Sequence, residues 1–142
     1  MNRINSVVET IVALLVFLFL YTALSKYADQ TTFKFSLHMS PILKGYSSII
    51  AIAIPSIELI IVALLIIPKT RLWGLYSSVS LLSLFTIYLI GIILFSKNLP
   101  CGCGGIINQL SWKGHILLNT IFISFSIFGI MSQKKMIVTQ KA

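Results

Sequence analysis

The strongest constraint on how this sequence can fold is a set of four long segments that are almost entirely apolar. Each is close to the roughly 20 residues that an α-helix needs to cross the hydrocarbon core of a bilayer. Within lipid every backbone N–H and C=O group needs a partner inside the protein, and a helix supplies these partners within one segment. We therefore predict an all-α fold, a polytopic four-helix membrane bundle that forms a single domain over residues 1–142. Its helices are expected at about residues 6–25, 48–67, 73–95 and 114–132.

The composition agrees with a chain that is surrounded by lipid. Of the 142 residues, 57% are hydrophobic and 10% are charged, whereas about half of a soluble domain is apolar and about a quarter is charged. The formal net charge of +8 raises the alternative of a nucleic-acid partner. The basic residues are scattered along the chain, however, and form no stripe interleaved with aromatic residues. We therefore expect a lipid bilayer as partner and no nucleic acid.

The first apolar segment, "SVVETIVALLVFLFLYTALS", has an alternative interpretation as a secretory signal peptide. Its start carries one arginine and one glutamate, and no small-x-small cleavage site leads into a soluble mature domain. The residues that follow lead into further membrane segments. We therefore expect this segment to be retained as the first helix of the bundle.

The lysines and arginines indicate which side of the membrane holds the termini, because four helices place both termini on the same side. That side carries two charges in the short loop "PKTR" and three in the tail "QKKMIVTQK", whereas the opposite lysines are spread through the longer loops 26–47 and 96–113. The positive-inside rule then predicts cytoplasmic termini and periplasmic outer loops in a bacterial inner membrane. The basic residues of the terminal side are Arg3, Lys69, Arg71, Lys134, Lys135 and Lys141, and those opposite are Lys26, Lys34, Lys44, Lys97 and Lys113.

The segment between the first two helices, "KYADQTTFKFSLHMSPILKGYS", has a character of its own. The alternation of apolar and polar residues in "FKFSLHM" is compatible with a short strand. An interfacial helix fits equally, with Phe33, Leu37 and Ile42 on its apolar side, ended by Pro41 or restarted after it. We favour the interfacial helix, which would form a lid over the outer ends of the bundle.

Glu58 lies near the middle of the second membrane helix, where an ionised carboxylate is costly unless it is paired. We expect it to be protonated or bound to a donor. One interpretation is a buried hydrogen-bonding residue that locks helices together, and the other is a proton carrier or a quinone contact. The first is favoured because no second charge that could form a relay is visible within the membrane, since Glu9 lies near the cytoplasmic start of the first helix and can reach water. Pro55 precedes Glu58 by three residues, and a proline kink beside a buried carboxylate would leave a cavity.

Both cysteines of the chain lie in "NLPCGCGG", where Gly102 alone separates Cys101 from Cys103. Residues two positions apart can reach the Cα separation of a disulfide, and the glycine permits the unusual backbone dihedrals. Such a small ring is strained, which suits exchange better than stapling. Two thiolates could instead bind Cu(I) or Zn(II), or the cysteines could be inert. We favour the redox pair, and a purely structural role for the loop as an assembly surface remains a third possibility.

His115 begins the last helix 12 residues after Cys103, and Asn119 follows one turn later on the same face. His115 could deprotonate a cysteine, stabilise a thiolate, bind a metal or cap the loop. In the metal alternative the ligands would be Cys101, Cys103, His115 and His38, with Met39 nearby. Trp112 is expected to anchor the helix at the interface.

The sequence resembles the MauE branch of the MauE/DoxX superfamily in several motifs that occur in the same order along nearly the whole chain. They are "LYTALSKYADQTTFKFSLHMSPIL" at the end of the first helix, "IPSIELIIVALLIIPKTRLWGL" with its Pro-x-x-Glu, "FTIYLI" in the third helix, and "LPCGCGG" followed by "LSWKGHILLN". One departure is "CGCGG", where the family often has an aromatic residue before the last glycine.

The resemblance implies a polytopic protein that supports disulfide chemistry outside the cytoplasm, as the MauE protein does in maturing a disulfide-rich dehydrogenase subunit in methylamine-using bacteria. Its partners would be a thioredoxin-like periplasmic protein and a disulfide-containing client. Cys101 and Cys103 would be the redox pair, His115 and Asn119 would shape their site, and Glu58 would line the bundle beneath. A quinone or a second dithiol protein would complete the circuit, because thiols confined to one loop pass no electrons across a bilayer.

Overall fold

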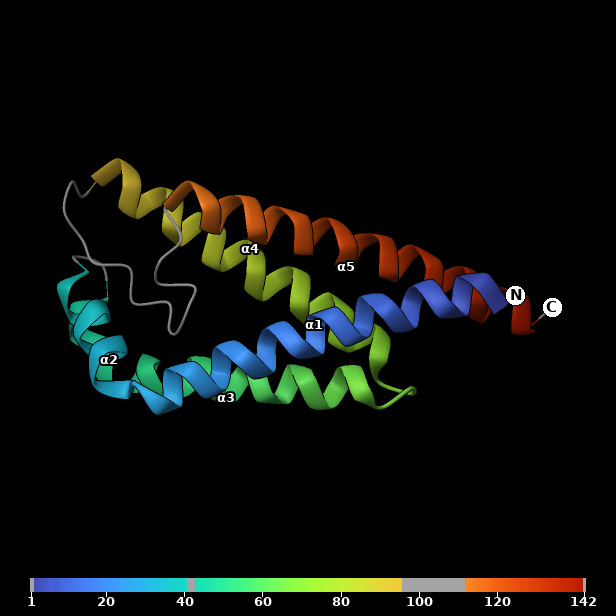
Figure 1. Cartoon of the computed structure of the whole chain (residues 1–142), viewed down its shortest axis with the longest axis horizontal. Coiled ribbons are helices and arrows are strands. Elements are labelled where there is room, and N and C mark those ends of the chain that lie inside the picture. Colours follow the sequence, from blue (N-terminus) through green and yellow to red (C-terminus); the bar gives the residue numbers. More distant parts are fainter. Residues whose placement is uncertain (1, 41–42, 96–111, 142) are drawn as a thin grey trace.

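The computed structural model describes residues 2–40, 43–95 and 112–141, and these residues are almost entirely helical, without a strand. Four of the helices are long and apolar enough to cross a membrane. The predicted all-α polytopic bundle is therefore confirmed (Figure 1). The elements are α1 (Asn2–Ala28), α2 (Gln30–Met39), the 3-10 turn η1 (Lys44–Tyr46), α3 (Ser47–Ile66), α4 (Arg71–Phe95) and α5 (Trp112–Lys141).

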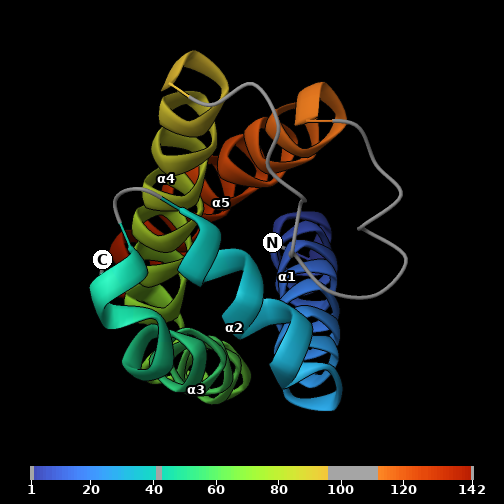
Figure 2. The same ribbon diagram turned by 90° about the vertical axis from the view of Figure 1, so that its left-hand side faces the viewer.

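The four long helices run along one axis, so the bundle has two distinct ends (Figure 1). The start of α1 and the end of α5 lie together at one end, which we call the terminal end. The end of α4, the start of α5 and the whole of α2 lie at the other, which we call the loop end. Helix α1 packs against α3 and α5, and α4 packs against α3 and α5. Viewed from the loop end, α2 crosses in front of the bundle between α1 and α3 (Figure 2).

Helix α2 confirms the predicted helical segment between the first two membrane helices, and the alternative of a strand is wrong for residues 30–39. The Asp29 side chain caps it by accepting a hydrogen bond from the Thr32 amide at 3.3 Å. Its apolar side buries Phe33 and Leu37, one turn apart, against Ala51 of α3. The third residue expected on that side, 42, and the proline at 41 lie outside the described residues.

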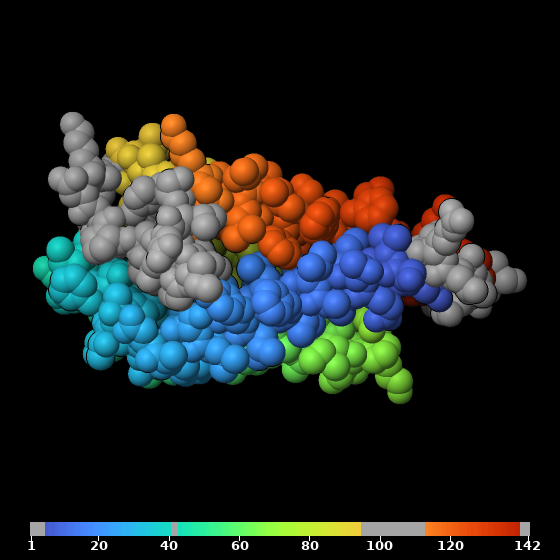
Figure 3. Space-filling view, in the orientation of Figure 1, coloured from blue at the N-terminus to red at the C-terminus, as the bar shows by residue number. Residues whose placement is uncertain are grey.

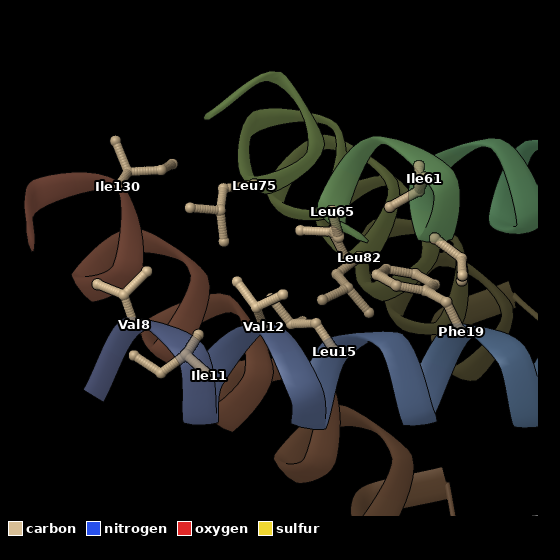
Figure 4. Packing of buried hydrophobic residues seen from close by; sticks show 11 residues of the cluster. Val8, Ile11, Val12, Leu15, Phe19, Ile61, Leu65, Leu75, Leu82 and Ile130 are labelled. Carbon is tan, nitrogen blue, oxygen red and sulfur yellow. The ribbon is translucent and has the colours of Figure 1, made fainter. Parts of the chain in front are cut away.

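The core is built from one face of α1, whose buried residues recur every three or four positions, as expected of a helix that packs through one side (Figure 4). They meet Leu65 of α3, Leu75 and Leu82 of α4, and Ile130 of α5. Large apolar side chains also point outward, as expected of a bundle solvated by lipid, and in the space-filling view α1 lies between α3 and α5 (Figure 3). The core residues of α1 are Val8, Ile11, Val12, Leu15 and Phe19.

Helix α1 is longer than expected, and this changes the position of one charged residue. The sequence placed the end of the helix near residue 25 and Lys26 in an outer loop. In the structure α1 continues to Ala28, and Lys26 lies within its last turn with only 2% of its surface exposed. The assignment of Lys26 to a solvated loop is therefore wrong.

Gly74 is a position at which α4 lies directly against the backbone of α3. A Cβ atom there would lie 2.9 Å from the Leu65 amide nitrogen and 3.0 Å from the Leu64 carbonyl carbon, and both are backbone atoms that cannot turn aside. We expect Gly74→Ala to lower the free energy of unfolding in detergent by about 1–3 kcal/mol, as overpacking does. Gly91→Ala in the same helix is the control, because its Cβ would meet nothing within 4 Å. Equal stability of the two variants would show that α3 and α4 have room for a methyl group at Gly74.

Candidate functional site

A buried ion pair joins α1 to α3 in the half of the bundle nearer the loop end. Lys26 Nζ lies 2.5 Å from Glu58 Oε1, and the two side chains are only 3% and 6% exposed. The expectation that Glu58 binds a donor is met, whereas the expectation that no second charge accompanies it is wrong. The attraction between two buried charges offsets the free energy of their desolvation only when they lie close together. Removing either Lys26 or Glu58 therefore leaves the other charge buried at a high cost in free energy.

The Lys26 ammonium group also faces two aromatic rings. Its Nζ atom lies 5.7 Å from the ring centroid of Phe33 in α2 and 5.6 Å from that of Phe85 in α4. Both distances fall within the range of a cation–π interaction. Lys26 therefore links α1 to α2, α3 and α4 together. A second polar contact between α1 and α3 lies close by, where the Tyr27 hydroxyl group and Ser56 Oγ are 2.9 Å apart.

A cavity of about 50 Å³ lies beside the ion pair, between α1, α3, α4 and α5. In the space-filling view atoms of α4 are visible in a hollow between α1 and α5 (Figure 3). Most of its walls are apolar, and α4 contributes only apolar side chains, Leu81, Leu82, Phe85 and Leu89. The polar groups at its surface come from the other three helices: Thr22, Lys26, Glu58, His115 and Asn119.

The cavity brings together three residues that the sequence singled out separately. Glu58 comes from α3, and His115 and Asn119 lie one turn apart on α5, as their spacing predicted. His115 is buried, with 4% of its surface exposed. The second Glu58 oxygen, Oε2, is also buried and accepts no hydrogen bond from the described residues. The site thus combines a carboxylate, an ammonium group, an imidazole and an amide around a small space.

A family model with the description "Methylamine utilisation protein MauE" matches residues 4–132. The chain belongs to the MauE family. The match spans α1 to α4, the segment with both cysteines and most of α5, and it confirms the resemblance seen in the sequence. No significant match was found among curated proteins or solved structures. The four apolar helices and the family together identify an integral membrane protein.

The thiol motif of this MauE-family chain, Cys101, Gly102 and Cys103, lies outside the described residues. The segment that contains it joins Phe95 to Trp112, and both of these residues lie at the loop end (Figure 1). Trp112 begins α5, but its side chain is not among those described. His115 therefore belongs to the first turn of the helix that follows the thiol segment.

The residues of the metal alternative are only partly described. His38 and Met39 are exposed at the end of α2, whereas His115 is buried in the bundle. Within the described ranges no three His, Cys, Asp or Glu residues are grouped as a metal site requires. The two thiols that would complete such a site lie outside these ranges, so the metal alternative stays a prediction.

The terminal end has a cleft of about 430 Å³ whose residues the sequence did not single out as a site. Arg71 Nη1 lies 2.6 Å from Glu9 Oε1 at its edge, and Glu9 is largely exposed. Lys69 and Gln133 also line it. An ion pair whose carboxylate is open to solvent contributes about 0–1 kcal/mol, so it has far less weight than the buried pair.

Sequence reasoning did not assign Lys26, Thr22 or the two aromatic rings around the ammonium group to a functional site. Lys26 could have been recognised from the sequence. It follows the first apolar segment directly, and the predicted spans contain a carboxylate, Glu58, for which the sequence names no partner. A buried carboxylate in a membrane helix calls for a cationic partner near it. Thr22 and Phe85 have no such signature, because threonine and phenylalanine are ordinary in apolar helices.

Proposed function

We propose that this chain is a membrane thiol–disulfide redox protein that supports disulfide formation or maturation in extracytoplasmic client proteins. A thioredoxin-like protein is its partner, and the name of the matching family points to methylamine utilisation as one setting for the client. The bilayer is the inner membrane of a bacterium, with cytoplasmic termini and a periplasmic loop end. The short, basic "PKTR" loop at the terminal end supports this orientation.

The observation that carries the proposal is the convergence of His115 and Asn119 on one polar site directly after the only two thiols of the chain. A dithiol needs a group that takes its proton, because the thiolate is the nucleophile. An imidazole in the first turn after the thiol segment is suited to this role, and Asn119 can orient it. Cys101 and Cys103, separated by Gly102, supply the exchangeable pair, and Trp112 marks the membrane boundary of the helix.

The exchange is a two-electron step between two disulfide couples. The Cys101 or Cys103 thiolate attacks the partner's disulfide, forms a mixed disulfide and releases one partner thiolate. The second cysteine of the pair then attacks the mixed disulfide and releases the other partner thiolate. The pair of this chain is oxidised, the partner is reduced, and two protons pass from the cysteines to the partner's sulfurs. The reverse sequence reduces the pair.

A quinone as final electron acceptor would bind outside the cavity next to Glu58. A volume of about 50 Å³ is smaller than the roughly 150 Å³ of an apolar cavity that accepts a benzene ring. We propose the disulfide of the thioredoxin-like partner as the oxidant of the pair.

Differential thiol labelling of intact cells tests the redox function. We expect Cys101 and Cys103 to be blocked under oxidising conditions and labelled after a membrane-permeant reductant, with both states interconverting when oxidant is restored. Labelling under every condition, together with stoichiometric copper or zinc in the purified protein, would replace the redox function with metal binding. Unchanged labelling without metal would indicate a structural loop.

A further inference from the structure

The buried Glu58 carboxylate has one oxygen that the protein leaves open. Oε1 is bound to Lys26, whereas Oε2 is buried and accepts no hydrogen bond from the described residues. Leaving a buried charged oxygen without a donor is unfavourable, because the hydrogen bonds that it made to water are not replaced. The cavity beside it holds about 50 Å³, and each water needs about 15 Å³ by this measure, so about three waters fit.

The cavity also has the polar partners that such waters require. Thr22, Glu58, His115 and Asn119 contribute a hydroxyl group, a carboxylate, an imidazole and an amide from three helices. Buried waters typically make about three hydrogen bonds each to groups of this kind. A wholly apolar cavity would stay dry, whereas α1, α3 and α5 each contribute a donor or an acceptor to this one.

We propose that water in this cavity connects Glu58 with His115, and that Glu58 accepts and returns the proton displaced during thiol exchange. The inference rests on the proposed function only for the source of the proton. His115 is the member of the site nearest in sequence to the thiols, and Glu58 lines the same cavity from α3. The proton moves from a cysteine thiol to His115 and through the water to the Glu58 carboxylate as the thiolate forms, and it returns by the same route to the sulfur that leaves.

The surroundings of Lys26 allow Glu58 to be either ionised or protonated without leaving a buried charge unstabilised. When Glu58 is ionised, the ammonium group is its counter-ion at 2.5 Å. When Glu58 is protonated, the rings of Phe33 and Phe85 still face the ammonium group and stabilise its charge. The titratable groups at the cavity are Lys26 from α1, Glu58 from α3 and His115 from α5, and α4 contributes none.

The test measures how fast the reduced protein in lipid nanodiscs is oxidised by glutathione disulfide, a small oxidant whose leaving thiolate takes up a proton. We expect Glu58→Gln, which keeps the shape but cannot accept a proton, to slow the reaction about a hundredfold. Glu58→Asp keeps the carboxylate and is expected to stay within about tenfold of the unmodified protein. The matched control is Tyr27→Phe, which removes a neighbouring polar contact between the same two helices.

A purely structural role for Glu58 predicts a different pattern. The rates of the Gln and Asp variants would then follow their unfolding free energies, measured on the same samples. The double variant Lys26→Met/Glu58→Met leaves no buried charge unpaired, so it separates folding from proton transfer if Glu58→Gln proves unstable. We expect this double variant to react about a hundredfold more slowly than the unmodified protein.

The possible results distinguish this inference from the proposed function. A wild-type rate for Glu58→Gln or for the folded double variant would overturn the proton role and leave the thiol chemistry intact. If the unmodified protein forms no Cys101–Cys103 disulfide with glutathione disulfide, the proposed function fails and the proton role fails with it. Slow reaction of Glu58→Gln and of the double variant, together with a rate for Glu58→Asp near that of the unmodified protein, would support both the proton role of Glu58 and the thiol–disulfide function.

Discussion

Lys26→Met is expected to lower the free energy of unfolding by about 3–5 kcal/mol, because it leaves the Glu58 carboxylate buried without its counter-ion. The two cation–π contacts of the ammonium group are lost at the same time. Methionine preserves much of the length and apolar volume of the lysine side chain, so the loss reports the charge more than the packing. Reversible unfolding in mixed detergent micelles, followed by circular dichroism, measures the change.

The double variant Lys26→Met/Glu58→Met is expected to recover most of this loss. Replacing both members of a buried ion pair by apolar residues is often neutral or stabilising, because neither charge then has to be desolvated. Lys34→Met is the matched control, since Lys34 lies on the adjacent α2 and is exposed. A double variant no more stable than Lys26→Met would show that Glu58 is not held in place by Lys26.

The four membrane helices could be predicted from the sequence because their length and apolar character are local properties. The helical form of α2 was also predictable, since Phe33 and Leu37 are spaced to share one buried face. The end of α1 was predicted wrongly, because it was placed where the apolar segment ends. No residue in "LSKYADQ" breaks a helix at residue 25. The chain continues to Ala28, and Lys26 remains in the bundle because its partner is there.

The site was only partly predictable because its members come from helices far apart in sequence. Glu58 and His115 could be recognised individually, one as an expensive charge and the other by its position after the thiols. That they share one cavity depends on how α1, α3, α4 and α5 pack, which no local pattern specifies. The same holds for Gly74, whose contact with Leu65 requires α3 and α4 to meet at that level.

Cys101→Ser and Cys103→Ser are each expected to stop the oxidation of the chain at a mixed disulfide. In the unmodified protein the second cysteine attacks that mixed disulfide intramolecularly, and such reactions have effective concentrations far above those of free thiols. With one cysteine left, release of the second glutathione molecule is expected to slow at least a hundredfold. Mass spectrometry of the quenched protein counts the attached glutathione molecules. The control is the variant in which both cysteines are replaced by serine.

The two single variants are also expected to differ from one another. The cysteine that the oxidant reaches first should form its adduct rapidly when it alone is present, whereas the other should form it slowly. Equal rates of adduct formation in the two variants, with two glutathione molecules attached to the unmodified protein and no Cys101–Cys103 disulfide, would mean that the two thiols act independently and form no pair.

The central claim is that Cys101 and Cys103 exchange disulfides with a thioredoxin-like partner. Purifying each single-cysteine variant from membranes quenched in acid, and identifying the proteins attached to it, tests this claim most directly. We predict a reductant-sensitive adduct with a thioredoxin-like protein on one of the two variants and none on the variant without cysteines. Free, alkylatable thiols in both variants, with copper or zinc bound stoichiometrically to the unmodified protein, would contradict the claim.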